Sequence, residues 1–230
     1  MNNNAILLPE WANQSAIQLT WPHEGTDWRE YLDDICATYA EMADAITRYE
    51  KLLVVAPEPE LVKKELSKKL TSCQLDNIIF HKCPTNDTWA RDHGFITLGG
   101  DGTYTLLAFR FNGWGDKFEA ALDNAINRSL YDNGVVEGTY TDLNSFVLEG
   151  GSIESDGRGT VLTTSQCLLA PHRNQPLTRS EIEQKLKSML HAERILWIDY
   201  GHLEGDDTDG HIDTLVRIAP DDTLLYIGCD

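Results

Sequence analysis

Three β-hairpin patterns recur along the 230-residue chain, and a helical pattern separates each hairpin from the next. The hairpin turns are marked by Asp101, Asp156 and Asp221, which lie 55 and 65 residues apart. Recurrence over this distance is typical of a repeated supersecondary unit. The sequence therefore predicts an α/β fold in which similar units are arranged around an axis.

The segments around the hairpins predict further helices and strands from their hydrophobic periodicity. Asp27 and Glu30 have the spacing of a capping box, which predicts the start of a helix there. Its expected inward face consists of Tyr31, Ile35, Tyr39, Met42, Ile46 and Tyr49. The other expected strands are 16–21, 52–56, 77–81 and 194–198, and the other expected helices are 58–70, 117–131 and 180–190. Leu61, Leu66, Leu70, Phe118, Leu122, Ala125 and Ile126 are expected to point inward from these helices.

An acidic residue comes shortly before each hairpin: Asp92, Glu149 and Asp213. These acids precede the turn aspartates by nine, seven and eight residues. If the units are arranged around an axis, the three carboxylates occupy equivalent places and converge there. The alternative is that hairpins are common and that aspartate is frequent before strands.

The neighbours of the first two acids are also unusual. Trp89 lies three residues before Asp92, and its indole face could pack against a cation. The alternative is a core tryptophan beside a surface Arg–Asp pair. Glu149 is followed by Gly150 and Gly151, which permit close approach of the backbone. The alternative here is a β-bulge with a glutamate that faces solvent.

The third acid follows a histidine at a spacing of two. On a strand, His211 and Asp213 would point to the same face. The histidine can exchange a proton near neutrality, and the aspartate supplies a negative charge. Two convergent acids would bind a planar guanidinium in fork geometry and orient its carbon for attack. Glu149 would orient His211 or accept a further N–H of the guanidinium.

Composition restricts the partners and the compartment. Nineteen Lys and Arg residues against 37 Asp and Glu residues give a net charge of −18, which argues against nucleic acid or an anionic membrane surface and favours a cationic small molecule. We expect no signal peptide and no membrane span. Five scattered cysteines lack CxxC spacing and fit a reduced cytoplasmic protein. The sequence contexts of Cys36, Cys73, Cys83 and Cys167 are those of ordinary small apolar residues.

Six stretches in combination resemble the agmatine deiminase family, which is related to the bacterial peptidyl-arginine deiminases. They are 9–12, 20–23, 87–92, 111–115, 148–152 and 206–213. The resemblance implies a pentein-type α/β-propeller of five ββαβ-like units around a pseudo-fivefold axis. We expect residues 1–230 to form a single domain of this type, with about three and a half units, truncated at its C-terminal end.

The resemblance also implies roles for individual residues. Asp92 and Asp213 look like the acids that clamp the guanidinium, and His211 looks like the general acid/base with Glu149 as its partner. Trp89 resembles the residue that forms a wall of the substrate pocket in the family, and Asp207 is expected to contact the substrate. In such enzymes a cysteine thiolate attacks the guanidinium carbon, ammonia leaves, and water releases a ureido product. The implied reaction converts agmatine to N-carbamoylputrescine and needs no metal or organic cofactor.

The chain departs from the family pattern at the nucleophile. The family carries it in a Gly-rich stretch followed by His-Cys, and no stretch of this chain matches; Cys229 is not assigned the role. We therefore expect that the chain alone does not complete the reaction and that a C-terminal segment or a second copy completes the ring. Glu154 stands where many agmatine deiminases carry histidine, so agmatine, arginine and peptidyl arginine remain open as substrates.

Three other functions fit parts of the sequence. One is a protein that binds guanidinium groups and has lost its thiol. Another is an amidinotransferase on the same fold, which would use similar residues with a different acceptor. The third is a metal protein whose ligands would be His202, Asp206, Asp209 and His211.

Overall fold

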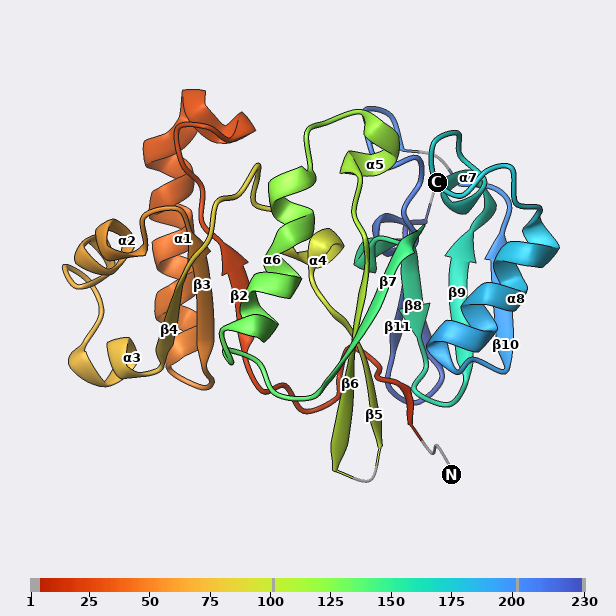
Figure 1. Cartoon of the computed structure of the whole chain (residues 1–230), viewed down its shortest axis with the longest axis horizontal. Coiled ribbons are helices and arrows are strands. Elements are labelled where there is room, and N and C mark those ends of the chain that lie inside the picture. Colours follow the sequence, from red (N-terminus) through yellow and green to blue (C-terminus); the bar gives the residue numbers. More distant parts are fainter. Residues whose placement is uncertain (1–4, 101, 202, 229–230) are drawn as a thin grey trace. The chain divides into compact units, whose positions relative to one another are not determined.

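The computed structural model describes residues 5–100, 102–201 and 203–228 (Figure 1). The predicted turn residue Asp101, the candidate metal ligand His202 and Cys229 lie outside the described residues. The chain divides into two compact units. Unit 1 comprises Met1–Ala12, Arg91–Glu119 and Glu137–Asp230, and unit 2 comprises Asn13–Ala90 and Ala120–Val136. The expectation of one domain over 1–230 stays a prediction.

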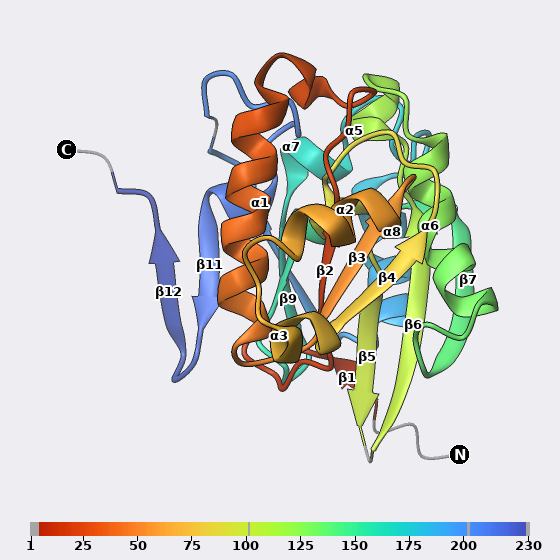
Figure 2. The same cartoon turned by 90° about the vertical axis from the view of Figure 1, so that its left-hand side faces the viewer.

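Unit 2 is built on a parallel sheet of three strands in the order β2-β3-β4. The strands are β2 (Ile17–Thr20), β3 (Leu52–Ala56) and β4 (Ile78–Lys82). All five residues of β3 are buried, because an unbroken apolar run suits a central parallel strand that is covered on both faces. Helices α1 (Leu32–Thr47), α2 (Pro59–Leu66) and α3 (Ser72–Asp76) lie on one face, and α6 (Ala121–Asp132) lies on the other (Figures 1 and 2).

Several predicted helix details in this unit are wrong. Asp27–Tyr31 is a 3-10 turn (η1), and its N-cap Thr26 makes no side-chain cap bond, so the capping box at Asp27 and Glu30 does not form. The α-helix begins only at Leu32, and its buried face differs from the predicted one. Ala43 and Thr47 are buried, Tyr39 and Ile46 pack beside the core, and Tyr31, Met42 and Tyr49 are exposed.

The other two predicted helical faces in unit 2 are also shifted. Leu66 and Leu70 are buried as predicted, but Val62 takes the inward place expected for Leu61, which is exposed. The helix predicted over 117–131 begins at Ala121, and Ile126 and Leu130 fill its buried face. Phe118 in unit 1, and Leu122 and Ala125 in α6, are exposed. The buried face of α6 also contains Asp123 and Asn127, whose polarity hid the periodicity.

Unit 1 contains all three predicted hairpins. Its strands are β1 (Ile6–Leu7), β5 (Ile96–Gly100), β6 (Thr103–Arg110), β7 (Thr139–Val147), β8 (Ile153–Ser155), β9 (Thr160–Thr164), β10 (Arg194–Ile198), β11 (Val216–Ala219) and β12 (Thr223–Tyr226). They form sheets in the orders β1-β5-β6-β7, β10-β9-β8 and β11-β12. The pairs β5–β6, β8–β9 and β11–β12 are antiparallel, as hairpins require.

The first two hairpins repeat one connection. In each, a helix-containing crossover follows the hairpin and leads to a parallel partner for its second strand, β7 beside β6 and β10 beside β9. In the second, the crossover helix is α8 (Arg179–Leu190), which buries Ile182, Leu186 and Leu190 in the unit 1 core. This hairpin–helix–strand repeat matches the predicted α/β unit.

Short single-turn elements join the strands of unit 1. They are α4 (Ala90–His93), which begins at the unit boundary, α5 (Gly113–Asp116), η2 (Gly150–Ser152), α7 (Ser165–Leu168) and η3 (Ile212–Thr214). Asp92 and Asp213 lie on these turns, and Glu149 and His211 are the N-cap residues of η2 and η3. Within the described part of the chain, every helix is too short or too polar to cross a membrane.

Candidate active site

Four predicted site residues meet in unit 1: Asp92 on α4, Glu149 before η2, and His211 and Asp213 at η3. The Nδ1 atom of His211 lies 3.7 Å from Oδ1 of Asp92 and 4.0 Å from Oδ1 of Asp213. Glu149 is fully buried, which excludes the alternative of a solvent-facing bulge residue. The three acids that precede the hairpins therefore converge around one imidazole.

Gly151 allows this close approach. Its backbone N–H donates a hydrogen bond to Oδ1 of Asp92 over 2.9 Å. A Cβ atom at this position would lie 2.6 Å from Nδ1 of His211 and 2.8 Å from carboxylate oxygens of both Asp92 and Asp213. The glycine that the sequence suggested for backbone approach is thus required by packing at the centre of the site.

The carboxylate of Asp92 is held at both oxygens. Oδ2 accepts a hydrogen bond from Nε1 of Trp114 over 3.0 Å. Trp114 has a φ of 57° and lies in a tight turn that the side chain of Asn112 stabilises by accepting the N–H of Gly115. Trp114 lies in the stretch 111–115 that resembles the family, but the amino-acid sequence did not predict its hydrogen bond to Asp92.

His211 is presented by a loop with internal hydrogen bonds. The Asp206 carboxylate accepts the N–H groups of Thr208 and Gly210 over 2.8 and 2.6 Å, and Oγ1 of Thr208 accepts the N–H of His211. Burial raises the pKa of Asp206, but these hydrogen bonds outweigh it and lower that pKa. His211 is the N-cap of the 3-10 turn η3, so the prediction that His211 and Asp213 lie on a strand is wrong.

Asp213 is more accessible than Asp92, with a side chain that is 19% exposed. Burial raises the pKa of Asp213, and the negative charge of Asp92 raises it further. The positive charges of His211 and Arg91 oppose this rise. Arg91 pairs with Glu10, and its Nη2 donates to the carbonyl of Gly150. Arg91 is therefore engaged with Glu10 and the Glu149 loop, not in a surface pair with Asp92.

Glu154 is also buried and charged. Its Oε1 lies 2.5 Å from Nε of Arg217, and its Oε2 accepts the N–H of Ile218 over 3.0 Å. Burial raises the pKa of Glu154, whereas the Ile218 N–H and the charge of Arg217 lower it. Position 154 of this chain thus has an acid paired with its own cation.

Glu149 is paired with a cation that the sequence reading missed. Nε of Arg173 lies 2.8 Å from Oε1 of Glu149, and both side chains are completely buried. Burial raises the pKa of Glu149, and the charges of Arg173 and His211 oppose this. A sequence signal existed: Arg173 is the single Lys, Arg, Asp or Glu residue between Arg158 and Arg179.

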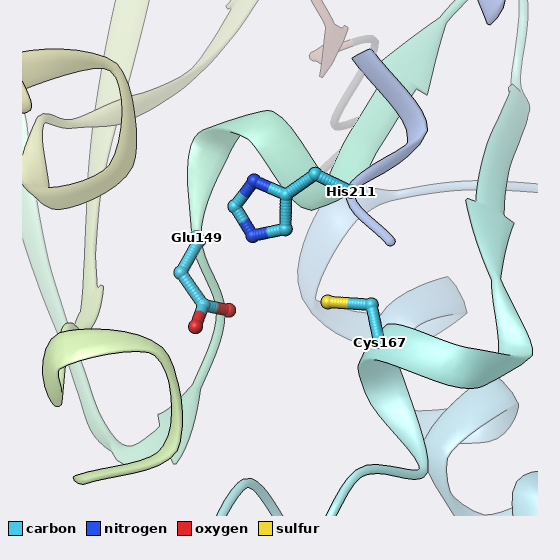
Figure 3. Close-up of side chains that lie close together, drawn as sticks. All are labelled: Glu149, Cys167 and His211. Atoms are coloured by element: carbon cyan, nitrogen blue, oxygen red, sulfur yellow. The ribbon is translucent and has the colours of Figure 1, made fainter. Parts of the chain in front are cut away.

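Cys167 belongs to the hydrophobic core of unit 1, as predicted, but its thiol also lies beside this buried charged group. Figure 3 shows Glu149 and Cys167 pointing toward the His211 ring. Cys167 Sγ lies 3.9 Å from Nη2 of Arg173. Burial, reinforced by the charge of Glu149, raises the pKa of the thiol well above its usual value. The thiol is therefore protonated at neutral pH, and its side chain is completely buried.

The structure also tests the residues that could hold a metal ion. Potential ligand atoms of Glu149, Cys167 and His211 all lie within 4.8 Å of one another. However, the Arg173 guanidinium already pairs with Glu149 and places a positive charge beside this set, which does not fit a divalent cation. In the predicted metal loop, the Asp209 carboxylate pairs instead with Arg173 and Lys117 over 2.8 Å and 2.7 Å.

Two predicted substrate residues, Trp89 and Asp207, form hydrogen bonds with residues outside this cluster. Trp89 belongs to unit 2, where it is 44% exposed and donates its indole N–H to Asp87 over 3.1 Å. It is therefore not a core tryptophan. Asp207 is exposed in the His211 loop, and its backbone carbonyl accepts a hydrogen bond from Nζ of Lys117.

Comparison with known proteins identifies relatives over nearly the whole chain. A family model described as Porphyromonas-type peptidyl-arginine deiminase matches residues 6–230. Agmatine deiminase from Ectopseudomonas mendocina is 34% identical over 94% of this chain and 58% of the relative. A cysteine-to-serine variant of C. jejuni agmatine deiminase, solved with substrate bound, is 39% identical with a TM-score of 0.86 and covers 96% of this chain and 64% of that one.

Agmatine deiminase of Enterococcus faecalis is 29% identical with a TM-score of 0.80, over 93% of this chain and 58% of that one. The chain thus spans less than two thirds of the length of each of these relatives. The likeness in structure confirms the predicted pentein-type α/β fold, and the family model covers both units. The chain belongs to the family of agmatine deiminases and Porphyromonas-type peptidyl-arginine deiminases.

Proposed function

We propose that this chain forms the guanidine-binding part of a hydrolase of the agmatine deiminase type. The observation that carries the proposal is the position of two carboxylates, Asp92 and Asp213, within 4.0 Å of the same nitrogen of His211. A guanidinium substituted once offers five N–H donors in a plane and pairs with carboxylates in fork geometry. Two fixed acids beside a proton carrier suit such a group.

Each residue has a role in this proposal. Asp92 binds the guanidinium in a fixed orientation, because the Gly151 N–H and the Trp114 indole already hold its two oxygens. Asp213 binds from the more accessible side. His211 carries a proton to the departing nitrogen, and its Nε2 has no hydrogen-bond partner among the described residues. Glu149 supplies the negative charge that stabilises the imidazolium.

We further propose that the nucleophile is a cysteine thiolate from a segment outside these 230 residues, or from a second copy of the chain. The thiolate bonds to the guanidinium carbon, and the C–N bond breaks as the leaving nitrogen takes a proton and departs as ammonia. Water then attacks the amidino carbon and releases the thiol and a ureido product. The buried, protonated thiol of Cys167 does not supply this group, and the cysteine-to-serine change in the C. jejuni structure supports a cysteine elsewhere.

Agmatine is the substrate that the electrostatics favour. Agmatine carries two positive charges and no carboxylate, whereas free arginine brings a negative charge to a chain of net charge −18. The relatives named agmatine deiminase agree with this choice. The proposed products are N-carbamoylputrescine and ammonia. Four free cysteines among the described residues suit a reducing compartment, for which we propose the cytoplasm.

Titration calorimetry with agmatine tests the binding step directly. We expect binding by the unchanged chain and its loss in Asp92→Ala, whereas Glu204→Gln, an exposed acid in the segment before the His211 loop, binds normally. Equal affinity of Asp92→Ala and the unchanged chain would overturn the assignment. Competition by arginine and by a peptidyl arginine then ranks the substrates. Detection of a ureido product with the native protein from its source separates an enzyme from an inactive binder.

A further inference from the structure

The buried Arg173 guanidinium contacts two parts of the candidate site at once. On one edge Nε forms an ion pair with Oε1 of Glu149 over 2.8 Å, a contact of opposite charges without the geometry of a hydrogen bond. The other edge donates from Nη1 to Asp209 over 2.8 Å and from Nη2 to the carbonyl of Thr208 over 2.9 Å. Thr208 and Asp209 lie in the loop that ends at His211. One side chain therefore connects the acid partner of the histidine with the loop that carries the histidine.

We propose that Arg173 is a positioning residue that keeps Glu149 as a carboxylate and fixes the His211 loop against it. This role of Arg173 adds to the proposed function, and it matters for guanidine chemistry only if that function holds. Arg173 does not contact the substrate in this proposal, because its side chain is completely buried between Glu149 and the loop. Its planar fork suits the task, since two edges can bind two partners in fixed directions.

The charges around Glu149 show why a cation is needed there. The titratable and charged groups that face it are Arg173, His211, Asp92 and Cys167. Burial and the negative charge of Asp92 both favour the protonated acid, and the charges of Arg173 and His211 oppose them. A buried carboxylate without a partner takes up a proton instead of remaining charged. Without Arg173, Glu149 would therefore lose the charge that His211 needs.

Lys117 provides a matched control for this proposal. Its ammonium group binds the same Asp209 carboxylate over 2.7 Å and the carbonyl of Asp207 over 2.7 Å. Lys117 thus holds the same loop with the same charge, but from a position where its side chain is 37% exposed. A role limited to holding the loop predicts that Arg173→Met and Lys117→Met behave alike. The proposal predicts that the two variants differ in the titration midpoint of the Glu149 carboxyl group.

The test follows the Glu149 carboxyl carbon by NMR in carbon-13-labelled protein, with the signal assigned from its absence in Glu149→Gln. We expect Arg173→Met to raise the titration midpoint by at least about one pH unit, because a close opposite charge lowers the pKa of an acid by about 1–3 units. Lys117→Met should leave the midpoint unchanged. Equal midpoints in Arg173→Met and Lys117→Met would overturn the proposal.

Arg173→Lys separates charge from geometry and serves if Arg173→Met does not fold. It should return the Glu149 midpoint toward that of the unchanged chain. It should still weaken agmatine binding by about tenfold, because an ammonium group cannot hold both partners in fixed directions. Unchanged affinity in Arg173→Lys would overturn the positioning role. If the unchanged chain binds no agmatine, the proposed function fails, and the Glu149 titration still decides the role of Arg173.

Discussion

His93 predicts a measurable dependence of stability on pH. This histidine lies on α4 beside Asp92, is buried, and faces the ring of Phe111 at a centroid distance of 6.2 Å. Burial lowers its pKa from 6.5 to about 4, and a backbone hydrogen bond only partly opposes this. The folded protein therefore holds the neutral imidazole, whereas the unfolded chain takes up a proton below pH 6.5.

The sign and size follow from this shift. A depressed pKa contributes stability that is present above pH 6.5 and is lost as the pH falls through about 4. At 1.36 kcal/mol per pKa unit, the loss is about 3 kcal/mol. The assay is urea unfolding by circular dichroism between pH 7 and about pH 4, for the unchanged chain and for His93→Gln. The difference between their unfolding free energies should change by about 3 kcal/mol over this interval.

The comparison isolates His93, because every other titrating group contributes equally to both proteins. His93→Gln will lower the stability at all pH values through changed packing, but a packing loss does not depend on pH. If the two stability curves run parallel from pH 7 to about pH 4, then the folded protein does not hold a neutral His93, and the reasoning is refuted.

Two further predictions concern the cores of the units. Burial raises the pKa of Asp123 in unit 2 from 3.8 to about 7, so the stability it contributes is lost as the pH rises through about 7; in Asp123→Asn this part of the pH dependence should disappear from the same urea titration. Leu186→Ala removes a fully buried side chain of α8 in unit 1 and should lower the free energy of unfolding by about 2–5 kcal/mol. The exposed neighbour Lys185→Ala should change it by less than about 0.5 kcal/mol, and a similar effect of the two would contradict the packing described for α8.

Local patterns predicted the three hairpins and the strands β2, β3, β4 and β10, because turn residues and strand periodicity depend on neighbours in the sequence, but β1 and β7 were not predicted. The helical faces were harder, since the buried positions are set by the sheet that each helix packs against. The small Ala43 of α1 is buried in the core and Tyr49 is exposed, although the large aromatic side chain of tyrosine suggested the buried position. On α6 the polar Asp123 is buried because it accepts the backbone N–H groups of Asn86 and Asp87.

The residues of the candidate site could be predicted where they occupy equivalent positions in the repeated units. Asp92, Glu149 and Asp213 each precede a hairpin, and the repeat brings equivalent places together. Arg173 and Trp114 occupy no such equivalent place, and their contacts with the acids join residues 24 and 22 positions apart. Cys167 lies in the hydrophobic core, as its sequence neighbours suggest, but they gave no sign of the charged groups beside its sulfur.

The missing side chain of Gly151 has a consequence for protein engineering. A methyl group there would meet His211, Asp92 and Asp213 at 2.6 to 2.8 Å, so even alanine would push the imidazole away from both acids. A library that varies all positions around the site should recover only glycine at residue 151, whichever guanidine is used for selection. Attempts to change the substrate must therefore start from residues farther out, where a new side chain leaves the spacing of the three groups intact.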